Sequence, residues 1–409
     1  MTPRSTRIYA DHAATGWPKP PGVVDAVADY MNHVGAAAGR GQYGSAAIAQ
    51  QVVASTRRSL AQMLGGVPEH CISFHASGTA AIHAALLGML RAGSHVVTTA
   101  AEHNSVLRPL DHLCRRGTIT MTVVDVDRVG RVDADAVLDA IRDDTRWIAM
   151  TTASNVTGAI QPLERIVQEA QPRGVRVFCD AAQSFGWKSL DVTKVPVDLV
   201  AAPGHKASGG PLGTAMLYAG EHLHDEIMPV IFGGTGSNSE SLSMPTDMPT
   251  KLEPGNLNVP AIAGWDVALK ACLDAGDRSD RGRELAGRLW SECYDAGFDT
   301  TPTPGDLPIV PLWCDRATAE ELAIVLDQEF HVEARAGLHC AAEVHRCLAS
   351  PEEGELRLSL GPETSDETLR QLIEAIHALA AGCGLRRRGS VERPAMPTRD
   401  APLSMGAKK

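Results

Sequence analysis

The 409-residue sequence lacks the features of secreted and membrane proteins. It has no apolar stretch of signal-peptide length near its start and no uncharged run long enough to cross a bilayer. Its nine cysteines are an odd number and include no C-x-x-C pair, which is typical of reduced thiols rather than of a disulfide framework. We therefore expect a cytoplasmic protein.

An excess of basic charge is also missing, except near the C-terminus. The chain has 38 Lys and Arg against 49 Asp and Glu, so its net charge of −11 argues against a general attraction to nucleic acid. Residues 386–409 differ, because seven Lys and Arg stand there against only Glu392 and Asp400. With three prolines and no apolar periodicity, this segment is predicted to be a disordered basic tail.

The rest of the chain has the composition of a globular protein, with 44% hydrophobic and 21% charged residues. Short, nearly all-apolar runs alternate with amphipathic helix patterns, which predicts an α/β fold with a mainly parallel sheet flanked by helices. The predicted strands are 95–99, 119–126, 147–152, 175–179, 199–202 and 214–218. The pattern changes near residue 250, and a smaller α+β domain is expected beyond it. The predicted large domain is 15–255, and the small domain combines 1–14 with 256–385.

Polar residues recur where predicted strands end. They are Ser77-Gly78-Thr79, Glu102-His103-Asn104, Asn155, Asp180-Ala-Ala-Gln183 and Gly204-His205-Lys206. Because ligands of parallel sheets bind at the carboxyl ends of the strands, these turns predict one site for a polar, anionic ligand. No Lys-Ser/Thr completes a Walker motif in 204–211, and no G-x-G-x-x-G follows the first strand, so neither NTPase nor nicotinamide chemistry is supported.

A lysine beyond one strand and an aspartate beyond the preceding one fit pyridoxal phosphate (PLP). PLP needs an amine for a Schiff base, a carboxylate for its pyridine nitrogen and N–H donors for its phosphate. We predict Lys206 as the amine, Asp180 as the carboxylate and Gln183 as a donor to the ring hydroxyl. The turn 77–79 is the predicted phosphate cradle, and His103 is predicted to stack on the ring and relay protons. Each residue alone could be a surface lysine, a cap or a helix start, but their joint order favours the cofactor site.

Several segments together resemble one known family. They are Tyr9-Ala-Asp-His-Ala-Ala-Thr15, Glu102-His-Asn-Ser-Val-Leu-Arg-Pro-Leu110, Asp180-Ala-Ala-Gln-Ser184, Gly204-His-Lys206 and Arg335-Ala-Gly-Leu-His-Cys340. From about residue 8 to about 382 the sequence resembles class V (fold type I) aminotransferases, and within them the branch of cysteine desulfurases and selenocysteine lyases. The resemblance implies a PLP enzyme with a large α/β domain and a small α+β domain.

The resemblance also implies roles for residues that spacing alone does not assign. By this analogy Asn155 contacts the cofactor or the substrate, and His205 contacts the phosphate. Arg335 and Arg357 are implied to bind the substrate. Arg357 is implied to bind the carboxylate of the substrate, because the fork of a guanidinium matches a carboxylate bidentately. The segment Gly233-Gly-Thr-Gly236 looks like the family loop that sends Thr235 to the phosphate of the neighbouring subunit. A homodimer with shared sites is therefore implied.

The predicted nucleophile is Cys340. In a desulfurase a protein thiolate attacks the sulfur of the substrate, giving alanine and a persulfide, and two arginines close to Cys340 in the sequence should favour the thiolate. Two other interpretations compete. Cys340 could bind zinc with His339, His345 and Cys347, although their spacing matches no standard zinc motif, or it could be a small buried hydrophobe.

These observations predict a PLP-dependent L-cysteine desulfurase that forms a persulfide on Cys340. One alternative is a selenocysteine lyase or another C–S lyase of the same superfamily, and a second is a catalytically silent binding partner in sulfur transfer. A small amino acid is the expected substrate and a sulfur-acceptor protein a candidate partner, while no metal, nucleic acid or membrane is expected. The sequence does not identify the sulfur acceptor.

Overall fold

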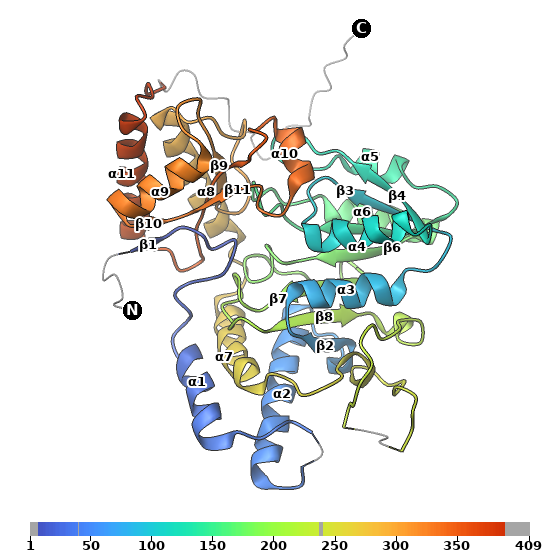
Figure 1. Cartoon of the computed structure of the whole chain (residues 1–409). Coiled ribbons are helices and arrows are strands. Elements are labelled where there is room, and N and C mark those ends of the chain that lie inside the picture. Colours follow the sequence, from blue (N-terminus) through green and yellow to red (C-terminus); the bar gives the residue numbers. More distant parts are fainter. Residues whose placement is uncertain (1–6, 40, 237–239, 389–409) are drawn as a thin grey trace.

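The computed structural model of the chain describes residues 7–39, 41–236 and 240–388. The predicted basic tail, 386–409, lies outside these ranges except for its first three residues. A seven-stranded sheet occupies the centre of the larger part of the molecule (Figure 1). Its order is β2-β8-β7-β6-β5-β3-β4, and every pair is parallel except the two made by β8. The strands are β2 Ile72–His75, β3 Ser94–Thr99, β4 Ile119–Val124, β5 Thr145–Thr151, β6 Arg176–Asp180, β7 Leu199–Pro203 and β8 Ala215–Ala219.

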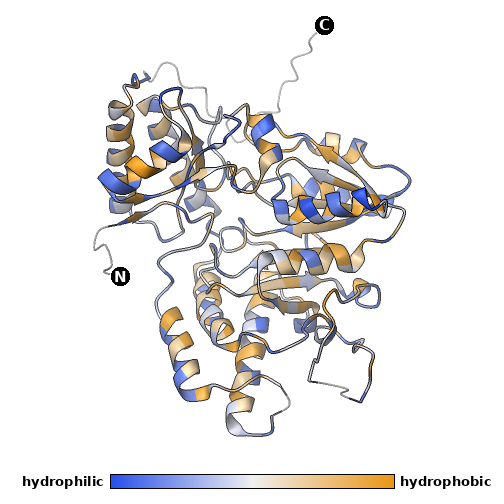
Figure 2. Ribbon diagram, in the orientation of Figure 1, coloured by the Kyte–Doolittle hydropathy of each residue, from blue (hydrophilic) through white to orange (hydrophobic). Residues whose placement is uncertain are grey.

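Helices cover both faces of this sheet, which is why its strands are apolar without interruption. In β6, Val177 and Cys179 join a core with one set of helices, whereas Phe178 between them joins a core on the opposite face. Figure 2 shows the apolar strands between helices whose outer faces are hydrophilic. The helices of this part are α1 Val23–Asp29, α2 Gly44–Met63, α3 Gly78–Met89, α4 Asn104–Arg115, α5 Ala134–Asp139, α6 Leu163–Ala170 and α7 Val259–Ala275.

A second, smaller core forms around an antiparallel sheet of order β11-β12-β9. Its strands are β9 Ile309–Leu312, β11 Arg335–Gly337 and β12 Glu355–Ser359, and β1 Ile8–Tyr9 pairs in parallel with β10 Val332–Glu333 beside it. Its helices are α8 Ser279–Ala296, α9 Ala319–Phe330 and α11 Asp366–Gly382. Helix α10 Ala342–Leu348 instead places Val344 and Leu348 in the core of the large sheet. Short π or 3-10 turns lie at η1 Tyr30–Val34, η2 Glu69–Cys71, η3 Gln171–Arg173, η4 Glu221–Leu223 and η5 Thr250–Leu252.

The predicted fold class, α/β with a mainly parallel sheet and a smaller α+β part, is confirmed by this arrangement. The packing differs from the predicted domain division at two helices, α7 and α10, which both join the core of the large sheet. Residues of α7, among them the fully buried Trp265, join the core of the large sheet, and α7 packs along α1 and α2. The apolar face of α7 thus places the change of core after residue 275 rather than after 255. Among the described helices, none is long and apolar enough to cross a membrane.

Candidate active site

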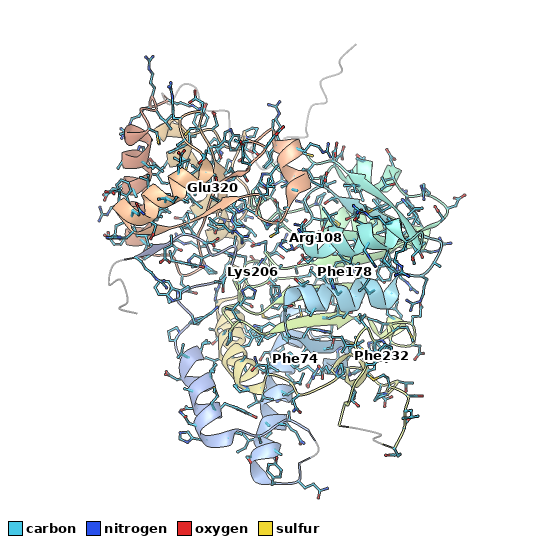
Figure 3. The ribbon with its side chains drawn as sticks, in the orientation of Figure 1. Phe74, Arg108, Phe178, Lys206, Phe232 and Glu320 are labelled. Carbon is cyan, nitrogen blue, oxygen red and sulfur yellow. The ribbon has the colours of Figure 1, made fainter. Side chains whose placement is uncertain are left out.

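The parallel register brings the predicted strand-end turns to one edge of the large sheet. Strands β3, β5, β6 and β7 run in the same direction, and β2 runs with them because β8 is antiparallel to both β2 and β7. Their carboxyl ends carry the turns that begin at Ser77, Glu102, Asn155, Asp180 and Gly204. Lys206 lies where this edge meets the smaller core (Figure 3). The convergence predicted from the sequence is therefore present.

Lys206 and Asp180 form the electrostatic centre of the site. The pKa of Lys206 is lowered from 10.5 to about 8, mainly by burial and in smaller part by Arg357 and Arg335, while Asp180 opposes the shift. Asp180 is 3% exposed and accepts a hydrogen bond from Ala182 N over 2.9 Å. Burial raises the pKa of Asp180, and Lys206 opposes that rise. An amine whose pKa lies near neutrality is a nucleophile at physiological pH.

His103 caps helix α4 and remains a neutral ring. Its Nδ1 accepts the backbone N–H of Ser105 over 3.1 Å and lies 2.7 Å from the Ser105 hydroxyl. Because Nδ1 is an acceptor, the proton of the neutral ring belongs on Nε2. Burial and the cations Lys206, Arg335, Arg108 and Arg357 lower the pKa of His103 to about 4. These charges also show that His103 lies close to the other site residues.

The N-terminus of α3 provides the predicted phosphate cradle. The Ser77 side chain caps the 12-residue helix by accepting from Ala80 N over 3.1 Å. A Cβ on Gly78 would lie 3.3 Å from the Pro203 side chain, so the lack of a side chain lets the start of α3 approach the end of β7. Thr79 is exposed beside it. Free N–H groups at a helix start favour a phosphate.

Three further predicted residues, Asn155, Gln183 and His205, add polar groups to this edge of the sheet. Asn155 donates from Nδ2 to His339 O over 2.8 Å, and Gln183 donates from Nε2 to Ala13 O over 3.1 Å. Asn155 Oδ1 and His205 Nδ1 are buried and have no hydrogen-bond partner among the described residues. Buried polar atoms of this kind are usually paired, so both atoms are suited to a ligand.

Arg357 is bonded within the chain. It is 1% exposed, and its Nη2 donates to Asp11 Oδ1 over 2.6 Å while Nη1 donates to Asn155 O over 3.0 Å. Its Nε is buried without a partner in the described part of the chain. Arg335 stands directly opposite on β11 in the antiparallel register, so two cations lie side by side with Asp11 as the counter-ion. Asp11 was not predicted as a site residue, although it lies within the N-terminal motif that supported the resemblance.

Cys340 is exposed, so the interpretation as a small buried hydrophobe is wrong. It follows β11 on a short loop, and Arg335 Nη2 lies 3.9 Å from its Sγ. The zinc interpretation is also wrong in its geometry, because neither ring nitrogen of His345 is free for a metal. Nδ1 is hydrogen-bonded to Glu355 and Nε2 to Leu338 O. Among the described residues, the one group of potential metal ligands is His70, Cys71 and Glu221 on the far end of β2.

Thr235 lies apart from this cluster in the same chain. It lines a groove with Arg57 and Glu253 between α2 and the segment before α7, and Phe232 of the same loop lies away from Lys206 in Figure 3. The described chain alone therefore does not bring Thr235 to Lys206.

Two buried ionisable groups beside the site were not predicted as functional residues. Glu102 is fully buried, accepts from Thr99 Oγ1 and Thr151 N, and has its pKa raised to about 8 by burial. Burial lowers the pKa of His12 to about 4, and His12 lines a cavity of about 510 Å³ that also reaches Lys206. Both belong to motifs that supported the resemblance, but only their burial distinguishes them from the other motif residues, and burial depends on the tertiary fold.

These residues fit PLP in their chemistry. The cofactor presents an aldehyde, a ring nitrogen and a phosphate, and the site has a group suited to each. They are the buried lysine with its lowered pKa, the buried carboxylate, and the start of α3, where Gly78 allows close approach to β7. The unpaired polar atoms of Asn155 and His205 add further hydrogen-bonding groups. Lys206 and Asp180 would hold its reactive end and its ring nitrogen, and the start of α3 its phosphate.

Several known proteins are similar to this chain in sequence or in fold. A cysteine desulfurase of Haloferax volcanii is 28% identical over 385 residues, covering 91% of this chain and 89% of its own. A selenocysteine lyase of Bos taurus is 28% identical over 307 residues and covers 67% of each chain. The fold is similar to that of the apo cysteine desulfurase of Thermococcus onnurineus, with a TM-score of 0.85, 24% identity and coverage of 92% and 95%. The family model for class-V aminotransferases matches residues 8–372, so the chain belongs to the aminotransferase class-V family.

Proposed function

We propose that the protein is a PLP-dependent L-cysteine desulfurase in which Cys340 receives the sulfur. The observation that carries this proposal is that the loop with Cys340, residues 338–341, is hydrogen-bonded to two turns at the carboxyl edge of the large sheet. Asn104 N donates to Cys340 O over 2.7 Å, and Asn155 Nδ2 donates to the preceding carbonyl, His339 O, over 2.8 Å. The backbone that presents an exposed thiol is thus bound by the turns after β3 and β5. The turn after β3 also carries His103, and Lys206 lies in the turn after β7 at the same edge of the sheet.

When bound, PLP supplies an electron sink that lets bonds at the α and β carbons of an amino acid break. The chain supplies the remaining functions. Lys206 provides the amine that would hold the cofactor, Asp180 the negative charge for its ring nitrogen, and Arg357 with Arg335 the cations for a substrate carboxylate.

The proposed reaction joins L-cysteine and the Cys340 thiol to give L-alanine and a Cys340 persulfide. The Cys340 thiolate attacks the substrate sulfur, a sulfur–sulfur bond forms, and the carbon–sulfur bond breaks with its electron pair left on carbon. That carbon takes up a proton and becomes the methyl group of alanine. Arg335 Nη2, 3.9 Å from Cys340 Sγ, is placed to favour the thiolate over the thiol.

His103 is the proposed proton relay. Its ring carries the proton on Nε2, and its Nδ1 lies 2.7 Å from the Ser105 hydroxyl oxygen. The ring can therefore give a proton from Nε2 while Nδ1 takes one from the Ser105 hydroxyl, which in turn takes up a proton from a water molecule, so that neither the ring nor the hydroxyl becomes an anion. Stacking of this ring on the cofactor remains part of the same proposal.

A homodimer with shared sites is also part of the proposal. The loop that carries Thr235 exposes Ile231 and Phe232, which are 65% and 71% accessible, and exposed apolar side chains of this size favour a protein interface. The proposed occupant is a second copy of this chain, with Thr235 reaching its phosphate. A sulfur-acceptor protein would then take the persulfide from the exposed Cys340.

Product analysis tests the proposed reaction. Purified enzyme with PLP is given L-cysteine, and alanine, pyruvate, sulfide and protein-bound sulfur are measured together. The proposal predicts alanine in equal amount to transferred sulfur. Pyruvate with free sulfide would instead indicate an elimination lyase. Alanine from selenocysteine but not from cysteine would favour the activity named for the Bos taurus relative. An absence of any product, together with no PLP absorbance, would indicate a silent protein.

A further inference from the structure

We propose that the buried pair Glu355 and His345 is a positioning device for the cysteine loop, residues 338–341. The two side chains set the loop conformation that presents Cys340, and they take no part in the bond changes themselves. This inference rests on the proposed role of Cys340 as the sulfur acceptor.

The cysteine loop has a backbone conformation that its own residues disfavour. His339 and Cys340 have φ of 49° and 59°, so two successive non-glycine residues lie in the left-handed region. A Cβ crowds the backbone there, which makes such residues uncommon and makes their conformation depend on surrounding contacts. Something outside the two residues must therefore hold the loop.

The Leu338 carbonyl is one point at which the loop is held. It accepts the backbone N–H of Ala341 over 2.9 Å, which closes the turn, and it also accepts from Nε2 of His345 over 3.0 Å. A carbonyl only accepts, so Nε2 must carry a proton. His345 is 4% exposed on α10, and its ring therefore ties the helix after the loop back to the start of the loop.

Glu355 fixes the orientation of this ring. Its Oε2 lies 2.7 Å from Nδ1 of His345, and Glu355 is completely buried on β12. The Ser350 hydroxyl lies 3.1 Å from the same nitrogen, and the ring keeps the proton on Nε2 that it donates to Leu338 O. The other carboxylate oxygen, Oε1, has no hydrogen-bond partner among the described residues. A buried carboxyl is costly unless it is paired, so its contact with His345 accounts for its presence in the core.

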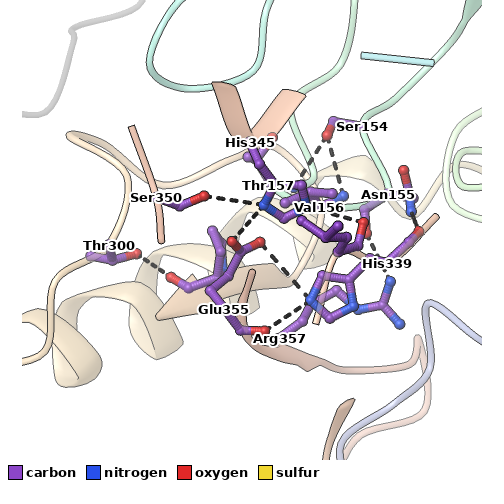
Figure 4. Close-up of polar contacts among 12 residues, drawn as sticks. Ser154, Asn155, Val156, Thr157, Thr300, His339, His345, Ser350, Glu355 and Arg357 are labelled. Atoms are coloured by element: carbon purple, nitrogen blue, oxygen red, sulfur yellow. Dashed lines mark hydrogen bonds and ion pairs between the residues drawn. The ribbon is translucent and has the colours of Figure 1, made fainter. Parts of the chain in front are cut away.

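The same glutamate also holds the middle of the loop through its backbone. His339 donates from Nε2 to Glu355 O over 3.1 Å, and Glu355 pairs with Gly337 in the antiparallel register of β11 and β12. Figure 4 shows Glu355 with His345 and Ser350 above it and His339 and Arg357 beside it. Two neighbouring histidines are thus held by one residue, one through its carboxylate and one through its carbonyl.

In the described part of the chain, neither Glu355 nor the His345 ring forms a hydrogen bond with Cys340, Lys206 or His103. The pair therefore acts on Cys340 only through Leu338 and His339. The lack of direct contact assigns the pair a positioning role rather than an acid–base role. It predicts that the hydrogen bonds of Glu355 matter more for the loop than its negative charge does.

Four variants of the PLP-loaded enzyme test the proposal. Glu355→Ala removes the carboxylate, and His345→Phe keeps a ring but removes both ring nitrogens. Glu355→Gln keeps an amide that can donate to Nδ1 while Nε2 still donates to Leu338. Glu343→Ala on the exposed side of α10 is the matched control, since Glu343 contacts Arg346 and not the loop.

Amide hydrogen exchange of peptides covering 335–348 and steady-state kinetics are the two readouts. For Glu355→Ala and His345→Phe we expect roughly tenfold faster exchange in the loop and about a tenfold lower kcat for alanine, with KM and PLP absorbance little changed. Glu355→Gln and Glu343→Ala should resemble the wild type in every measurement.

Wild-type exchange rates in both Glu355→Ala and His345→Phe would overturn the proposal. Equal losses in Glu355→Gln and Glu355→Ala would also overturn it, because they would assign a role to the charge. If Glu355→Ala does not fold, His345→Phe and Glu355→Gln still decide the outcome. Failure of the proposed function has a different signature, namely undiminished alanine production by Cys340→Ala, and the exchange measurement needs no substrate.

Discussion

The guanidinium of Arg357 donates from Nη2 to the carboxylate of Asp11 over 2.6 Å, across 346 positions of sequence. This contact joins the N-terminal segment to β12 and supplies the counter-ion for an arginine that is 1% exposed. Burial lowers the pKa of Arg357 and Asp11 raises it. The pair thus keeps a cation in a buried position where a substrate carboxylate is proposed to bind.

Removal of Asp11 should destabilise the protein and not only the site. Asp11→Ala leaves the buried Arg357 without its carboxylate, and breaking a buried ion pair in this way costs about 3 kcal/mol or more. The Asp11→Ala/Arg357→Leu double variant should recover part of that loss. Denaturant unfolding measures both. Arg370→Ala, which removes an exposed contact with Glu367 at 2.6 Å, serves as the control and should change stability by no more than about 0.5 kcal/mol. An effect of Asp11→Ala as small as the control's would contradict the account.

The rate at which apoenzyme takes up added PLP should depend on pH through Lys206. The amine is reactive when unprotonated, and its pKa is lowered to about 8, so the rate should rise with a midpoint near pH 8 rather than near 10.5. Asp180 raises that pKa, so Asp180→Asn should move the midpoint to lower pH. Stopped-flow absorbance at constant PLP concentration measures the profile. A midpoint that stays in place or moves upward in Asp180→Asn would count against the proposed Lys206–Asp180 coupling.

Self-association should depend on the exposed loop before Thr235. Replacing Ile231 and Phe232 by Ser removes apolar side chains that are 65% and 71% accessible, and we expect at least a tenfold weaker dimer if they are buried against a second copy. Sedimentation at several protein concentrations measures this. Ile324→Ser on α9, an equally apolar residue that is 52% exposed, should leave association unchanged. A loop variant that associates as strongly as the wild type would place the interface elsewhere.

The positions of most strands of the large sheet, and the polar turns at their carboxyl ends, could be predicted because both depend on local signals. The apolar run 199–202 lies within β7, and the run 214–218 overlaps β8. The turn with Lys206 follows β7 directly. Strand β2 was not predicted, because Ile72–His75 has a serine and a histidine among four residues and so lacks an apolar run.

Long-range contacts could not be predicted from the sequence. Nothing local in Asp11 indicates Arg357 as its partner, and Glu355 looks like an exposed residue of an acidic turn although it is completely buried beside His345. The same limit applies to α7, whose packing on α2 in the core of the large sheet is a tertiary result. Residues that hold the site in place were therefore harder to find than residues that line it.

The location of the transferred sulfur tests the central claim most directly. After L-cysteine is added, peptide mass spectrometry should find one additional sulfur atom on Cys340. Cys340→Ser should keep PLP absorbance but lose both this sulfur and alanine production. Cys347→Ser is the matched control, since burial raises the pKa of that thiol and it should remain unmodified and dispensable. Sulfur on another cysteine, or alanine formed at the wild-type rate by Cys340→Ser, would contradict the account.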